Sequence, residues 1–216
     1  MFYTSGGSAE EVAALIRGWW YMGAAPGAGV KPYTSTDATW SMPLYFYQIG
    51  LWQKLAGIGP LPARLLSLAI GVLDGILLFL ICKRLTANTV ASAAAAFIFL
   101  ATPATVFAFA TATPAATIAL FHLAAVWLIV AHMGRPKIWA SIAIGAISAA
   151  LYFYRQDMIL AVIVLLPLYA VSVGRGERAK HAAIAVAALA LCAGGLLAVF
   201  PPKLMSYALR LPVIYP

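Results

Sequence analysis

Six apolar runs separated by short polar connections dominate the chain after residue 64. They cover about residues 65–82, 87–110, 114–132, 138–154, 158–173 and 181–200. Each is close to the roughly 20 residues that an α-helix needs to cross the hydrocarbon core of a bilayer. Pro103 and Pro114 lie within or between these runs, and proline interrupts the hydrogen bonds of a helix, so we expect helices to kink or end there. The pattern predicts an all-α fold, a polytopic transmembrane helical bundle with about six spans.

The first 64 residues follow a different pattern, with apolar and polar residues alternating at helical spacing. Residues 9–22 form a predicted amphipathic helix, which lies on a membrane rather than through it. Residues 43–56 are too few and too polar to span a bilayer, and their aromatic side chains favour the interface. We therefore divide the chain into outward-facing amphipathic helices and a loop (1–64), the bundle (65–200), and an outward tail or the start of a further loop (201–216).

Composition and charge support a membrane protein. The chain is 64% hydrophobic and 9% charged, whereas soluble domains carry about 25% charged residues. The formal net charge is +8, but the basic residues stand in short clusters after the first, third and fifth runs. If the spans alternate, all three clusters fall on one side, which the positive-inside rule makes cytoplasmic. This distribution argues against a nucleic-acid partner and for a multi-pass membrane protein in contact with membrane lipid.

This orientation places residues 1–64 outside the membrane, although no signal peptide precedes them. Either the segment crosses unaided, or a transmembrane helix lies upstream of Met1. We expect the second, because the charge bias is the same in all three basic clusters. The sequence is then part of a longer protein.

Three carboxylates in the first 64 residues are candidates for acid–base chemistry or metal binding. Glu10 and Glu11 begin the first amphipathic helix, where a capping box and the helix dipole also favour acidic residues. Asp37 lies in a polar loop, where an Asx-type turn is the alternative interpretation. In a functional role, Glu10 or Glu11 is a general base or metal ligand, and Asp37 is a second outward carboxylate. The residues alone leave both interpretations open.

Two arginines at the outward ends of predicted spans are candidate phosphate ligands. Arg155 follows three aromatic residues at the end of the fourth run, and Asp157 stands close enough to hold its guanidinium in place. Arg64 begins the first run. Arginine pairs with phosphate oxygens in a fork geometry that lysine lacks. The alternative is an interfacial cluster whose charged groups simply reach the headgroups.

One further acid, Asp74, lies in the middle of the first span. A charged group at the bilayer centre costs about 3 kcal/mol on insertion scales, so we expect Asp74 to be neutral or to face a protein interior. A proton relay is the alternative. Such a relay would fit one possible function of the chain, a small transporter or flippase that uses Asp74 together with the Arg155–Asp157 pair.

Several short segments, taken in chain order, resemble the GT-C superfamily of membrane glycosyltransferases, in particular its protein-mannosyltransferase and lipid-A-sugar-transferase branch. Ser8-Ala9-Glu10-Glu11 and the helix after it resemble the family's Asp-Glu pair and first outward helix. Ser41-Met42-Pro43-Leu44-Tyr45 resembles its His/Lys-Pro-Pro-Leu-Tyr segment. The other matching segments, in family order, are residues 51–57, 63–67, 83–85 and 154–157.

The resemblance implies a membrane glycosyltransferase that moves a sugar from a polyprenyl-phosphate (dolichyl-phosphate-like) donor to a glycan, lipid or protein acceptor on the outer face of the inner membrane. It implies an outward carboxylate as general base, which in several members also binds a divalent metal such as Mg²⁺ or Mn²⁺. Glu10 falls at the position of that carboxylate and would be the metal ligand, with Glu11 as its partner. Arg64 and Arg155 fall where phosphate contacts are expected.

The chain departs from the family pattern at several positions. Glu10 replaces an aspartate, and Ser41-Met42 replaces the charged residue and first proline. The connection at residues 111–115 carries no charge, although the family has a charged element there. These departures favour a second function, a non-catalytic protein of the same fold that binds a lipid phosphate or a partner.

Overall fold

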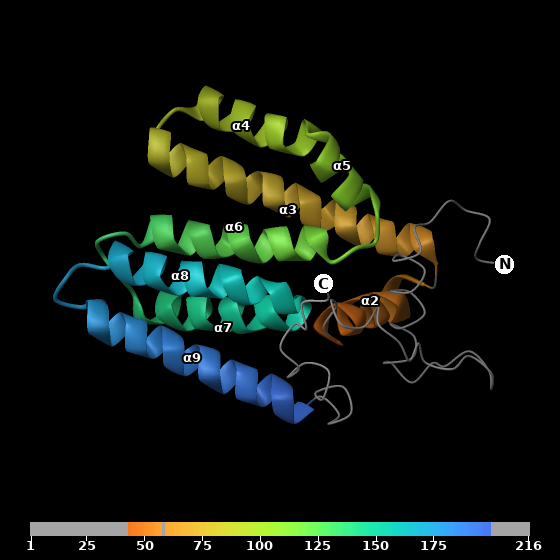
Figure 1. Ribbon diagram of the computed structural model, residues 1–216. Helices are drawn as coiled ribbons and strands as arrows, with labels where there is room; N and C mark the ends of the chain where they lie inside the picture. The colour runs from red at the N-terminus through yellow and green to blue at the C-terminus, as the bar shows by residue number, and fades with distance from the viewer. Residues whose placement is uncertain (1–42, 58, 200–216) are drawn as a thin grey trace, which may run out of the picture. The chain divides into compact units, whose positions relative to one another are not determined.

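The computed structural model describes residues 43–57 and 59–199 (Figure 1). Every regular element in these ranges is a helix, which confirms the all-α prediction. The elements are α2 (Pro43–Ala56), α3 (Pro60–Thr86), α4 (Thr89–Ala101), α5 (Pro103–Ala110), α6 (Ala115–Ala131), α7 (Ile138–Tyr154), the 3-10 turn η2 (Gln156–Met158), α8 (Ile159–Ser172) and α9 (Arg178–Val199).

The helix boundaries follow the sequence pattern closely, and the largest difference is in α3. The first run extends into a longer helix, α3, because Pro60 suits a first helical turn and the helix continues to Thr86. It ends at Ala87, which adopts φ 54 and donates its N–H to the Lys83 carbonyl at 3.0 Å. The second run is broken as expected at Pro103, where α4 and α5 meet at a bend of 64°.

The predicted number of spans is not confirmed. Among the described residues, α3 and α9 are long and apolar enough to cross a bilayer, and the bent α4–α5 pair makes a third span if counted as one. The other three apolar helices, α6, α7 and α8, have 17, 17 and 14 residues. A 17-residue helix is about 25 Å long, short of the roughly 30 Å hydrocarbon core. Six spans therefore stay a prediction.

The chain divides into two compact units. The described part of unit 1 is Leu44–Leu120, which contains α2 to α5 and the beginning of α6. Here α3 packs on α4 and α5, and two glycines leave room for side chains of those helices: a Cβ at Gly71 would lie 2.5 Å from the Phe109 ring, and one at Gly75 would lie 2.8 Å from the Leu100 side chain. The buried cluster of Ile70, Phe109 and Ala116 completes this contact.

Unit 2 begins at Phe121 and contains the rest of α6, then α7, η2, α8 and α9. Its closest packing is between α7 and α9, which run parallel (Figure 1). A Cβ added at Gly145 would overlap the Ala185 carbonyl oxygen and lie 2.8 Å from both the Ala188 Cβ and the Leu189 nitrogen. Small residues at this crossing therefore set the distance between the two helices.

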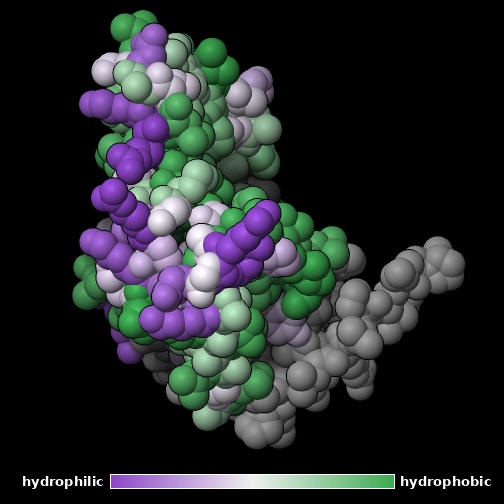
Figure 2. All heavy atoms as spheres, turned by 90° about the vertical axis from the view of Figure 1, so that its left-hand side faces the viewer, coloured by the Kyte–Doolittle hydropathy of each residue, from purple (hydrophilic) through white to green (hydrophobic). Residues whose placement is uncertain are grey.

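Large apolar side chains stay exposed along the helix flanks. On α3 they include Leu65, Leu68, Val72, Leu73 and Ile76, and on α8 they include Ile159, Leu160, Ile163, Val164 and Leu168. Exposed apolar surface of this extent is typical of a protein that contacts lipid tails. Figure 2 looks onto the side that carries the α3–α4, α6–α7 and α8–α9 connections, and shows hydrophilic side chains gathered there with hydrophobic side chains around them. The chain is thus an integral membrane protein.

Candidate functional site

The predicted site residues fall into three groups. Glu10, Glu11 and Asp37 lie outside the described residues, so their roles stay predictions. Arg64 belongs to unit 1, whereas Arg155 and Asp157 belong to unit 2.

A two-pronged ion pair joins Arg155 to Asp157. The Arg155 Nε donates to Asp157 Oδ1 at 3.0 Å, and its Nη2 donates to Oδ2 at 2.9 Å. The pairing of Asp157 with the guanidinium is thus present, and the phosphate-binding role of the two residues stays a prediction. Two parallel charge-assisted bonds fix the plane of the guanidinium as well as its position.

The backbone turn between α7 and α8 brings these two side chains together. Arg155 ends α7 in an extended conformation, with its N–H donated to the Leu151 carbonyl at 3.1 Å. The chain then enters η2, where Met158 N–H donates to the Arg155 carbonyl at 3.1 Å. This short turn places Asp157 beside the guanidinium of a residue only two positions earlier.

The pair remains partly open to solvent, with side-chain exposures of 37% for Arg155 and 33% for Asp157. At this exposure an ion pair adds little to stability. A guanidinium has five N–H donors, of which the carboxylate uses two. The remaining donors are chemically able to bind a second anion; that this anion is a phosphate stays a prediction.

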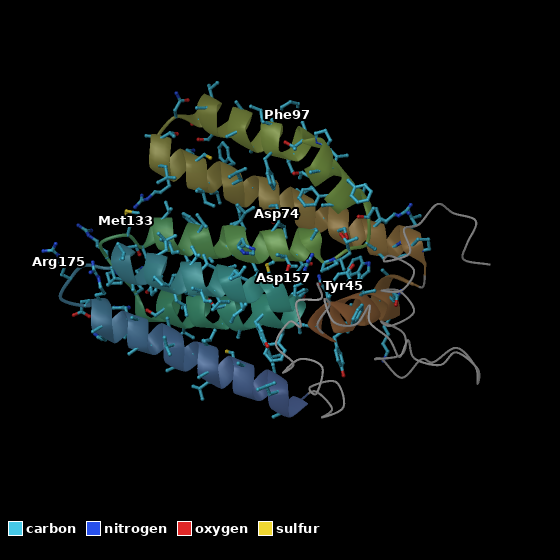
Figure 3. All side chains as sticks on the ribbon, viewed as in Figure 1. Tyr45, Asp74, Phe97, Met133, Asp157 and Arg175 are labelled. Carbon is cyan, nitrogen blue, oxygen red and sulfur yellow. The ribbon has the colours of Figure 1, made fainter. Side chains whose placement is uncertain are left out.

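Aromatic side chains lie directly before the pair. Phe153 and Tyr154 are 2% and 5% exposed. The Tyr154 ring meets the Phe121 ring edge to face, with centroids 5.3 Å apart. The charged pair therefore stands at the end of a packed aromatic segment of α7, at the boundary between apolar and polar surroundings (Figure 3 labels Asp157).

Arg64 lies in the second turn of α3, beside the elbow between α2 and α3. Trp52 Nε1 donates to the Pro62 carbonyl at 2.7 Å, which fixes α2 against the start of α3. Gln48 on α2 accepts a hydrogen bond from the Thr117 hydroxyl at 3.1 Å. Arg64 is half-buried in this setting. That Arg64 is a phosphate contact stays a prediction.

The predicted metal ligand, Glu10, is not among the described residues. Within the described part of the chain, no group of three or more His, Cys, Asp or Glu side chains lies close enough together to hold a metal ion. Both Asp157 oxygens already accept bonds from Arg155. The described residues therefore do not form a metal centre, and metal binding by Glu10 stays a prediction.

Asp74 is fully buried in α3, as expected for an acid that faces a protein interior. Neither carboxylate oxygen has a hydrogen-bond partner in the described structure. We expect Asp74→Asn to leave the melting temperature in detergent unchanged, because the amide has the same shape and no charge. Asp74→Lys should lower it strongly, since a buried charge costs about 3 kcal/mol in a membrane setting. An Asn variant as unstable as the Lys variant would show that the carboxylate is needed in its charged form.

Sequence reasoning missed a buried polar cluster in unit 2 that links α7, α8 and α9. The Ser141 hydroxyl lies 2.7 Å from the Tyr169 hydroxyl and 2.7 Å from His181 Nδ1. The His181 Nε2 lies 3.7 Å from Glu177. In the sequence His181 stands next to the basic cluster that follows the fifth run, a position that gives no sign of burial, but its side chain is 3% exposed. Since Ser141 is fully buried, the cluster ties helices together and offers no substrate access.

Ser141→Ala should destabilise the protein because it leaves the Tyr169 hydroxyl and His181 Nδ1 without this partner. Losing a buried hydrogen-bond partner costs about 1–3 kcal/mol. Ser148→Ala is the matched control, since Ser148 is equally buried on the same helix and its hydroxyl has no partner among the described residues. Thermal unfolding in detergent should show a lower melting temperature for Ser141→Ala alone. Equal shifts in both variants would contradict a role for the cluster.

Comparison with known families decides the class of protein. Residues 37–205 match the model of the dolichyl-phosphate-mannose-protein mannosyltransferase family. The chain belongs to this family. No curated protein and no solved structure gave a match. The resemblance inferred from short motifs is thereby confirmed, and the chain is a membrane glycosyltransferase of the GT-C type.

The matched range includes most of the residues discussed above. Asp37, Arg64, Arg155 and Asp157 lie inside it, whereas Glu10 and Glu11 lie before it. Membership of this family implies a lipid-linked sugar donor and an acceptor as the general kind of partner.

Proposed function

We propose that the chain transfers a sugar from a polyprenyl-phosphate donor to an acceptor on the outer face of a bacterial inner membrane, and that Arg155 binds the donor phosphate. The observation that carries this proposal is the Arg155–Asp157 pair. It is an oriented, partly exposed guanidinium at one end of an apolar helix. A phosphate at the membrane surface, attached to a lipid tail, suits such a position.

The distribution of basic residues between the two ends of unit 2 supports the placement of Arg155 on the outer side of the membrane. The α6–α7 and α8–α9 connections lie at one end of the unit, and the turn with Arg155 lies at the other (Figure 1). Those two connections and the first turn of α9 carry Arg135, Lys137, Arg175, Arg178 and Lys180. The positive-inside rule assigns the end richer in basic residues to the cytoplasm. Arg155 then faces outward.

In the proposed reaction, the acceptor hydroxyl oxygen attacks the anomeric carbon of the sugar. The bond between that carbon and the phosphate oxygen breaks, and polyprenyl phosphate leaves with one additional negative charge. A carboxylate takes the hydroxyl proton, and we propose Glu10 for this role, with Glu11 as its acidic partner and Asp37 as a second outward carboxylate. Arg155 stabilises the charge that grows on the phosphate, a contribution typical of fixed cations in transfer reactions.

Two variants of the full protein in native membranes test this proposal with a radiolabelled sugar on a polyprenyl-phosphate donor. Wild-type protein should move label into an acceptor fraction and release polyprenyl phosphate. Glu10→Gln should abolish the transfer while leaving donor binding intact, and Lys54→Gln, a change on an exposed α2 lysine, should retain it. Undiminished transfer by Glu10→Gln would remove Glu10 as the base.

A non-catalytic role is the second candidate, and the uncharged connection between α5 and α6 favours it. Ala112 is fully buried there, and the Thr111 hydroxyl donates to the Phe107 carbonyl at 2.9 Å. Residues 111–115 contain no charged side chain, although the family resemblance expects one there. Donor binding without any transfer, unchanged by Glu10→Gln, would support this role over catalysis.

A further inference from the structure

The end of unit 2 that lies away from Arg155 is built from two loops held together. Gly134 in the α6–α7 loop donates its N–H to the carbonyl of Ser172, the last residue of α8, at 3.2 Å. The α6–α7 and α8–α9 loops therefore share one end of the unit, where Figure 3 labels Met133 and Arg175. The 17 residues of α7 separate this end from Arg155 by about 25 Å.

Positive charge dominates this end. Its loops and the first turn of α9 carry five Arg or Lys side chains and one carboxylate, Glu177. Glu177 is already paired with Lys180 at 3.1 Å. Arg135, Lys137 and Arg175 are exposed and make no ion pair within the described structure. We call these three residues the basic face.

Exposed apolar side chains accompany the basic face. Met133, Ile138 and Trp139 are 58%, 52% and 52% exposed. Trp139 stacks edge to face with His132, with ring centroids 4.8 Å apart, so its indole is held in place while much of it stays accessible. Tryptophan and basic residues together are typical of the headgroup level of a bilayer.

We propose that the basic face binds the phosphodiester headgroups of anionic phospholipids in the adjoining leaflet. The unpaired cations supply charge complementarity, and Met133, Ile138 and Trp139 supply contact with the acyl region. A free phosphate or a soluble anion would use the cations but leave these apolar side chains in water. The site is separate from the proposed donor site and does not depend on it.

The charge of this face comes from arginine and lysine at neutral pH. Burial, and then the charge of Lys137, lowers the pKa of His132 from its ordinary value of 6.5. His132 is therefore neutral above pH 7, and lipid binding should change little between pH 7 and 8.

The test is a titration of the full chain with phosphatidylglycerol or with phosphatidylcholine, and native mass spectrometry measures how much of each lipid is bound. Wild-type protein should prefer phosphatidylglycerol, and the preference should fall as salt increases. The triple variant Arg135→Gln/Lys137→Gln/Arg175→Gln should bind phosphatidylglycerol at least about tenfold more weakly, since each basic residue near an anionic surface is worth about fivefold. Its binding of phosphatidylcholine should not change.

A charge-preserving triple variant, Arg135→Lys/Lys137→Arg/Arg175→Lys, is the matched control and should keep the preference. Equal wild-type binding of the two lipids would overturn the proposal, as would a glutamine variant that keeps the full preference. If the glutamine variant does not fold, the wild-type comparison of the two lipids at low and high salt gives the decision by itself.

Discussion

Replacing Arg155 with alanine should reduce sugar transfer from a polyprenyl-phosphate donor by at least about 100-fold, the loss typical of removing one charge-stabilising donor from a transfer site. The reason is geometric. Asp157 holds the guanidinium by two bonds of 3.0 and 2.9 Å. The N–H groups that Asp157 does not use stay available for the donor phosphate proposed to bind at the end of α7. Steady-state kinetics with varied donor concentration measure the effect.

Two further variants separate charge from geometry at this site. Arg155→Lys keeps the charge but loses the fork, so we expect an intermediate loss. Asp157→Asn keeps the size of the side chain but weakens the hold on the guanidinium, so it should raise the KM for donor more than it lowers kcat. Arg84→Ala removes an exposed arginine at the end of α3 and should have normal kinetics. Normal turnover by Arg155→Ala would end the phosphate role of Arg155.

The second large effect concerns stability rather than chemistry. Gly145→Ala should destabilise the protein, because its Cβ would overlap the Ala185 carbonyl oxygen and press on Ala188. Overpacking of this kind costs about 1–3 kcal/mol. Gly145→Val, with a larger side chain, should prevent α7 and α9 from packing and reduce the yield of folded protein.

Gly194→Ala is the matched control, since it makes the same substitution on α9 itself. A Cβ at Gly194 meets no atom within 4 Å, and alanine is favoured over glycine in a helix by about 1 kcal/mol. Thermal unfolding in detergent should therefore shift downward for Gly145→Ala and stay level or shift upward for Gly194→Ala. The same shift in both variants would mean that the α7–α9 contact does not limit stability.

Local features of the fold could be predicted from the sequence. The bounds of α2 and α7 and the break at Pro103 follow from apolar runs and proline, which act within a few residues. The Arg155–Asp157 pair was also predictable, because its partners stand only two residues apart.

Long-range features could not be predicted. Ser141 contacts Tyr169 and His181, which follow it by 28 and 40 residues. Only tertiary packing decides which faces of α7, α8 and α9 meet. A helix that is apolar on all sides has no sequence pattern that predicts which face contacts its neighbours. Because α7 and α9 also lack a polar face, the sequence does not predict that α7 packs on α9 at Gly145. The number of spans also stays a prediction, because α6, α7 and α8 are shorter than a full crossing.

Binding of polyprenyl phosphate, compared with the matching polyprenol, tests the central claim most directly because it needs neither the sugar nor the acceptor to be known. The measurement is equilibrium binding to purified wild-type protein and to Arg155→Ala. We expect wild-type protein to bind the phosphate at least about tenfold more tightly than the alcohol, as a charge-assisted contact to arginine provides, and Arg155→Ala to lose that difference. Equal binding of the two lipids by wild-type protein would contradict a donor-phosphate site at Arg155.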